Sequence, residues 1–166
     1  MNESAHSSRG IVLFAHGARD ARWAEPFERL AAKLRTLSGP DTHVSLAFLE
    51  LMTPDLPGAV AAQVAAGCTS ITVVPVFFGQ GGHVRRDLPV AIEACRAAHP
   101  DVDIHGTVPV GEDDAVLVEH HRVVAPGGGG DDGVALQRAA DALRLEDVLV
   151  VAEAALPVVV APEGPH

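Results

Sequence analysis

A nearly continuous run of β-branched and aromatic residues, 71–78, is the feature that most limits how this chain can fold. Such a run is typical of a strand buried on both faces, and strands of this kind lie in the centre of parallel sheets. A glycine-rich turn follows, in which Gly81 and Gly82 allow a sharp bend and a close approach to a ligand. His83 comes next and is a candidate site residue, because ligands bind at the carboxyl ends of strands in open α/β sheets. A loop histidine that bonds only backbone is the alternative.

Three further apolar segments predict strands on either side of this run. They cover residues 10–15, 43–49 and 102–108. Helical patterns separate the segments, and the alternation of strand and helix favours right-handed crossovers between parallel strands. The predicted fold is therefore an α/β three-layer sandwich. It has a central, mainly parallel four-stranded sheet with helices on both faces.

Three helices are predicted between these strands. In the first, apolar residues from Trp23 to Leu37 recur at steps of three and four, and Pro26 fits only within the first turn. The second is expected to begin with Thr53 as N-cap and Pro54 as its first helical residue. The third is expected to run over residues 86–98.

Length and composition favour one domain. The 166 residues suit a single domain, for which we expect a disordered leader (1–9), an α/β domain (10–125) and a glycine linker with a C-terminal extension (126–166). The net charge of −10 argues against a general nucleic-acid-binding face. The apolar run near the N-terminus is too short for a signal peptide or membrane span, so no membrane partner is expected.

The two cysteines, Cys68 and Cys95, form no CxxC motif. This spacing excludes a four-cysteine zinc or iron–sulfur site and favours a reducing cytoplasm. We expect both thiols to be small core residues, because free cysteine is usually buried.

Polar residues follow three consecutive predicted strands: His16 after the first, Glu50 after the second and His83 after the third. The carboxyl ends of parallel strands share one edge of the sheet, so these residues are expected to converge. Two imidazoles and a carboxylate suit a borderline divalent ion such as Co²⁺, Fe²⁺ or Ni²⁺, without selecting among them. With only two histidines, coordination positions stay open and the ion can be passed on. Either imidazole can also accept a proton near neutral pH.

Four of the twelve basic residues lie within six positions of these histidines: Arg19, Arg22, Arg85 and Arg86. One interpretation is a solvated surface. The other is a set of carboxylate binders around the site. The overall negative charge does not exclude an anionic ligand, because screening confines remote charge to roughly 8 Å, whereas arginine acts at contact range.

Three segments carry a resemblance to a known family: LFAHGARDAR, AFLELMTPDLPGAV and ITVVPVFFGQGGHVRRDLP. Their order and spacing resemble the motifs of the class II tetrapyrrole chelatases, specifically the short sirohydrochlorin chelatases of the CbiX/SirB kind. The resemblance covers about residues 10–111 and implies a chelatase-like sandwich with a flavodoxin-like winding. It implies ATP-independent insertion of Co²⁺ or Fe²⁺ into sirohydrochlorin, for cobalamin or sirohaem synthesis, by a homodimer.

The resemblance also implies roles for individual residues. His16 and His83 would be metal ligands and proton acceptors, and Glu50 a third metal-site or proton-relay group. The four arginines and the glycine turn would bind the polycarboxylate macrocycle. Cobalt is slightly favoured over iron, on resemblance to the short members alone.

Other functions have less support in the sequence. There is no G-x-S-x-G nucleophile elbow for a hydrolase, and neither G-x-G-x-x-G nor G-x-x-x-x-G-K for a nucleotide. A metal or tetrapyrrole carrier without turnover would use the same histidines, so the sequence does not separate it from a chelatase.

Overall fold

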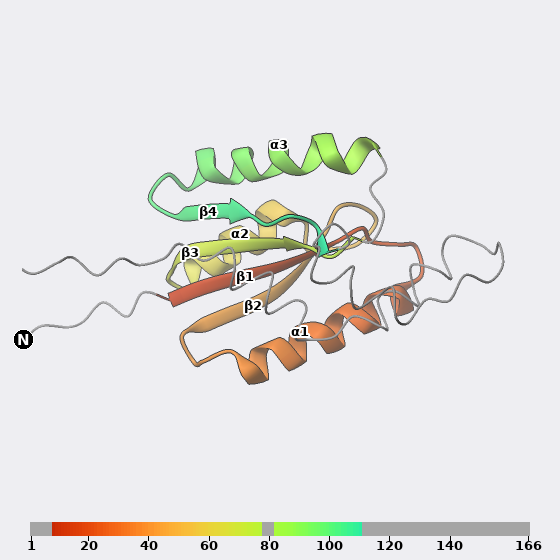
Figure 1. The fold of residues 1–166 in the computed structure, drawn as a ribbon, viewed down its shortest axis with the longest axis horizontal. Coiled ribbons are helices and arrows are strands. Elements are labelled where there is room, and N and C mark those ends of the chain that lie inside the picture. The colour runs from red at the N-terminus through yellow and green to blue at the C-terminus, as the bar shows by residue number, and fades with distance from the viewer. Residues whose placement is uncertain (1–7, 78–81, 111–166) are drawn as a thin grey trace, which may run out of the picture.

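The four predicted strands form one parallel sheet. The structure, a computed structural model, describes residues 8–77 and 82–110, except for the side chains of residues 82–85. The sheet has the order β2-β1-β3-β4, with every neighbouring pair parallel (Figure 1). The strands are β1 (Ser8–Ala15), β2 (Thr42–Phe48), β3 (Cys68–Pro75) and β4 (Asp103–Gly106). The predicted α/β fold class is confirmed, although β1 begins at Ser8, inside the expected leader.

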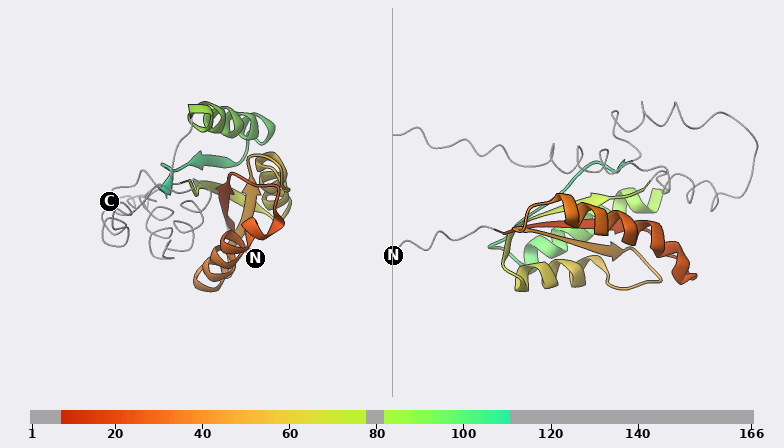
Figure 2. Two further views of the ribbon diagram at one scale, coloured as in Figure 1. Left: turned by 90° about the vertical axis from the view of Figure 1, so that its right-hand side faces the viewer. Right: turned by 90° about the horizontal axis from the view of Figure 1, so that it is seen from below.

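Helices cover both faces of this sheet. They are the short 3₁₀ helix η1 (Ala21–Ala24), α1 (Glu25–Leu37), α2 (Leu56–Ala65) and α3 (Gly82–Ala98). In the views of Figure 2, α1 lies across the sheet from α2 and α3. No helix within the described ranges is long and apolar enough to cross a membrane.

The core is divided by the sheet into two layers. On one side, Phe27 and Leu34 of α1 pack on Leu13 and Val74. On the other, residues of α2 and α3 such as Val60 and Ile92 pack in the cluster that holds Phe14 and Val73. Alternate residues of β1 therefore serve opposite layers, and Val12, Leu13 and Phe14 are all buried. This two-sided burial explains why the central strands are continuous apolar runs.

The start of α2 differs from the prediction. Asp55, not Thr53, is the N-cap, and its carboxylate accepts a hydrogen bond from the Gly58 amide at 2.9 Å. Pro54 lies outside the helix because its carbonyl accepts a hydrogen bond from the Phe48 amide at the end of β2. The prediction at Thr53–Pro54 is therefore wrong, since a tertiary contact overrides the local helix-start signal.

The start of α3 also differs, and it changes the setting of His83. The helix begins at Gly82 rather than at residue 86, so His83 belongs to its first turn and not to a preceding loop. Pro89, which the predicted boundary would place in the first turn, lies inside the helix. The predicted end of α3 at Ala98 is confirmed.

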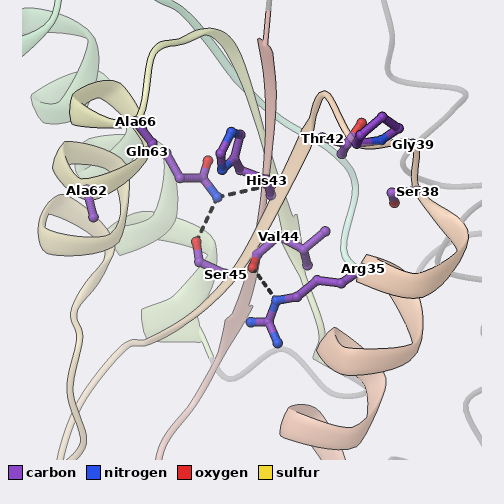
Figure 3. A pocket seen from close by; sticks show the side chains of 11 residues that line it. Arg35, Ser38, Gly39, Thr42, His43, Val44, Ser45, Ala62, Gln63 and Ala66 are labelled. Carbon is purple, nitrogen blue, oxygen red and sulfur yellow. Dashed lines mark hydrogen bonds between the residues drawn. The ribbon is translucent and has the colours of Figure 1, made fainter.

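Side chains from two helices hold the edge strand β2. Gln63 of α2 is buried, and its amide donates hydrogen bonds to the carbonyls of Ile11 and His43 and to the Ser45 hydroxyl (Figure 3). On the opposite face, Arg35 of α1 donates to the Val44 carbonyl at 2.8 Å. These contacts tie β2 to a helix on each face of the sheet. Arg35, Val44 and Gln63 are among the residues that line a cavity of about 410 Å³ beside β2.

Burial of both cysteines predicts that neither thiol reacts in the native protein. Cys68 and Cys95 are each 2% exposed, and burial raises the pKa of both thiols. A raised pKa keeps the neutral thiol as the dominant form at mildly alkaline pH, so the reactive thiolate is scarce. With a thiol-specific disulfide reagent at pH 8, we expect no reaction in buffer and two equivalents in denaturant. Fast native labelling of either residue would contradict its place in the core.

Candidate functional site

The winding of the sheet creates a switch point between β1 and β3. β1 is central, with β2 on one side and β3 on the other. The chain leaves β1 toward α1 on one face, whereas α3, the next described element after β3, lies on the other face (Figure 1). Such a divergence leaves a crevice outside the carboxyl ends of the strands, where ligands bind in doubly wound folds. The residues predicted from the sequence follow the strands at this edge.

His16 lies directly after β1 and is held by an aromatic contact. Its imidazole packs edge-on against Phe77, with ring centroids 4.9 Å apart and planes inclined by 60°. Phe77 is 3% exposed and also contacts Phe14, at 5.7 Å between centroids. The imidazole is half-buried, so it is positioned by the core while part of it reaches solvent.

Glu50 is tied to His16 through the backbone. Its amide donates to the His16 carbonyl at 3.0 Å, and the Leu49 amide donates to the Ala15 carbonyl at 2.8 Å. Gly17 has φ of 88°, and a Cβ there would overlap the Glu50 carbonyl oxygen. The two strand exits are thus in direct backbone contact, which only glycine at position 17 permits. The Glu50 side chain itself is exposed.

His83 lies in the first turn of α3, the next described element after β3. Only its backbone belongs to the described part of the chain, and Gly81 lies outside it. The chain is described up to Phe77, which contacts His16, and again from Gly82 at the start of α3. Among the described residues, no group of three or more His, Cys, Asp or Glu is arranged to hold a metal. The joint role of His16, Glu50 and His83 therefore stays a prediction.

The four arginines occupy different settings. Arg22 forms an exposed ion pair with Asp20, at 2.7 Å between Nη2 and Oδ2. The hydrogen bonds from Arg22 lower the pKa of the Asp20 carboxyl, which also caps η1. Arg19 and Arg86 are exposed, and the side chain of Arg85 lies outside the described part. The guanidinium of Arg22 therefore already has a carboxylate partner.

Two residues of this edge were not assigned a site role from the sequence. Phe77 was predicted only as part of a strand, and Gly17 only as the residue after His16. A glycine directly after a strand is the one sequence signal that the Glu50 backbone can lie close to residue 17. The contact between Phe77 and His16 depends on strand order, which the sequence pattern does not contain.

Comparisons with known proteins agree with this architecture. The CbiX family model matches residues 10–123. The sirohydrochlorin cobaltochelatase of Methanopyrus kandleri is 34% identical over 79 residues, 48% of this chain and 54% of that protein. The sirohydrochlorin ferrochelatase of Bacillus subtilis is 30% identical over 121 residues, 69% of this chain and 44% of that protein. The matches thus span about half the length of these relatives.

A solved structure shows the same fold over most of the described chain. The putative cobalamin biosynthesis CbiX protein of Marinobacter aquaeolei superposes with a TM-score of 0.60 at 35% identity. The similarity covers 69% of this chain and 92% of that one. Because the family model spans more than half of the 166 residues, and the strand exits with His16 and Glu50 lie within the match, the chain belongs to the CbiX family.

Proposed function

We propose that this chain is a sirohydrochlorin chelatase that inserts Co²⁺ or Fe²⁺ into the macrocycle without ATP. One observation carries the proposal: a backbone hydrogen bond joins His16 and Glu50 at the carboxyl edge of β1 and β2, and α3, the next described element after β3, has His83 in its first turn. The names of the relatives, cobaltochelatase and ferrochelatase, supply the substrate class.

The reaction requires a cation that is held and then released. In the proposed mechanism, His16 and His83 bind the divalent ion through neutral imidazoles and leave coordination positions open to the incoming pyrrole nitrogens. Insertion displaces two N–H protons from the macrocycle. The histidines accept these protons as the metal crosses, and the exposed Glu50 carboxylate passes them to solvent.

Recognition of the macrocycle would use its carboxylates. Sirohydrochlorin carries eight of them around a flat ring, and guanidinium groups bind carboxylates through paired, charge-assisted hydrogen bonds. Arg19, Arg85 and Arg86 are the proposed partners. Arg22 joins them only if the macrocycle replaces Asp20 as its ion-pair partner. Gly81 and Gly82 would let the backbone approach the ring.

The proposal also includes a homodimer and a cytoplasmic location. One sheet edge covers one side of a flat macrocycle, so we propose that a second copy covers the rest in a homodimer. The two reduced, buried thiols support a cytoplasmic location.

Replacing either histidine should abolish metal insertion. In His16→Ala and His83→Ala, we expect kcat for Co²⁺ insertion into sirohydrochlorin, followed by absorbance, to fall by about a hundredfold or more, because each loses a ligand and a proton acceptor. His99→Ala, past the other end of α3, is the matched control. Circular dichroism verifies folding. Full activity in either variant would remove that residue from the mechanism. If the wild-type protein inserts the metal no faster than Co²⁺ and sirohydrochlorin react without protein, a carrier would be favoured instead.

Removing two arginines should weaken macrocycle binding rather than chemistry. Arg85→Ala combined with Arg86→Ala should raise the KM for sirohydrochlorin about tenfold or more, since each charge-assisted hydrogen bond contributes about 1.5–3 kcal/mol. The double variant Arg29→Ala, Lys33→Ala on α1 makes the same change in net charge and should keep the KM. An unchanged KM in the first pair would assign Arg85 and Arg86 to the solvated surface.

We expect the ranking of metals by kcat/KM to differ from their ranking by affinity for imidazole ligands. Imidazole sites bind Ni²⁺ more tightly than Co²⁺, and Co²⁺ more tightly than Fe²⁺. For a chelatase that must release its ion, we expect the highest kcat/KM with Co²⁺. Parallel assays with the three ions, under anaerobic conditions for iron, provide the ranking. A maximum with Fe²⁺ would instead assign the chain to a ferrochelatase role.

A further inference from the structure

The turn that follows Glu50 has an unusual backbone. Leu51 has φ of 62°, and within residues 8–77 and 82–110 it is the one non-glycine residue with positive φ. The Met52 amide donates to the Glu50 carbonyl at 2.8 Å, so a three-residue ring is closed around Leu51. A positive φ at the centre of such a turn is the strained γ-turn arrangement. Leucine is a poor residue for this conformation, which glycine or asparagine adopts more readily.

Tertiary contacts on both sides impose this turn. Before it, the amides of Leu49 and Glu50 donate to the carbonyls of Ala15 and His16. After it, Met52 packs against the core layer that α1 covers. The chain must therefore reverse within one residue between a strand exit and a core contact. The strain is held in place by the fold and lies next to a residue of the proposed site.

The Leu51 side chain gains little from the fold in return. It is 62% exposed, whereas most leucines of the described chain are buried. A leucine in a strained turn costs backbone energy, and because its side chain stays exposed it gains no compensating stability from burial. It follows Glu50 directly, at the carboxyl edge of the strands, where ligands bind in folds of this kind.

We propose that Leu51 is a substrate-binding residue that contacts the flat face of the macrocycle next to Glu50. This inference rests on the proposed function and adds the apolar half of recognition: arginines would bind the charged rim, and the leucine would contact the conjugated centre. Such contact is non-directional, so the ring can slide or tilt as the metal enters while its distance from the edge is kept.

The test separates apolar support from backbone strain. Leu51→Asn keeps a residue that tolerates positive φ but removes the apolar contact, and Leu51→Met keeps an apolar side chain. Leu37→Asn is the matched control, because Leu37 is 60% exposed at the far end of α1. Each variant is assayed for kcat, for the KM of sirohydrochlorin and of Co²⁺, for metal-free sirohydrochlorin binding by absorbance titration, and for Tm.

For Leu51→Asn we expect the KM and Kd of sirohydrochlorin to rise about fivefold to tenfold, the effect of losing part of a leucine's apolar contact. The KM for Co²⁺ should stay the same and the Tm should not fall. Leu51→Met and Leu37→Asn should keep wild-type constants for the macrocycle. A purely structural role would not raise the constants for sirohydrochlorin while leaving the KM for Co²⁺ and the Tm unchanged.

Three results would overturn the inference, each on different grounds. If Leu51→Asn binds and metallates sirohydrochlorin with the same constants as the wild type, the role of Leu51 alone would be overturned. A Leu51→Asn variant that loses dimerisation at unchanged metal-free macrocycle affinity would place Leu51 in a contact between copies and overturn it as well. A wild-type chain that neither binds nor metallates sirohydrochlorin would overturn the proposed function and this inference together.

Discussion

The parallel pairing of β1 with β2 on one side and β3 on the other is the constraint on which the site depends. Ala15 pairs with Phe48, and Phe14 with Pro75, so all three strands end at the same level of the sheet. Hydrogen bonds continue this pairing beyond the strands, from Glu50 to His16 and from Val76 to Phe14. Residues separated by dozens of positions in the chain are brought together as neighbours by this register. The buried apolar layers on both faces hold it in place.

Among the described residues, the one strained backbone position lies at this edge rather than in the core. Gly17 and Leu51, both with positive φ, stand on either side of the Glu50 backbone. The core strands carry ordinary extended backbone and bury their side chains almost completely. A rigid, well-packed sheet can hold an unfavourable turn at its rim, because the stability of the domain greatly exceeds the cost of one strained residue. That division is typical of folds in which loops at one edge bind the ligand.

The strands were predictable because burial on both faces leaves a strong signal in the residues themselves. The apolar runs locate all four strands to within a few residues, and the alternation with helices is enough to predict the parallel sheet. The start of α2 was not predictable in the same way. Thr53 and Pro54 carry a proper helix-start signal, but the hydrogen bond between Phe48 and Pro54 holds that segment beside β2 and moves the cap to Asp55.

The sequence by itself determined the α/β class, the burial of the central strands and the expectation that His16, Glu50 and His83 follow parallel strands. These properties are local, or follow from the chemistry of single segments and from the rule that parallel strands share their carboxyl edge. Only the tertiary structure decided that Phe77 positions His16, that the Glu50 amide is bonded to the His16 carbonyl, and that Leu51 occupies a strained turn. The physical reason is that contacts between strand exits arise from packing among distant segments, which no local pattern of residues records.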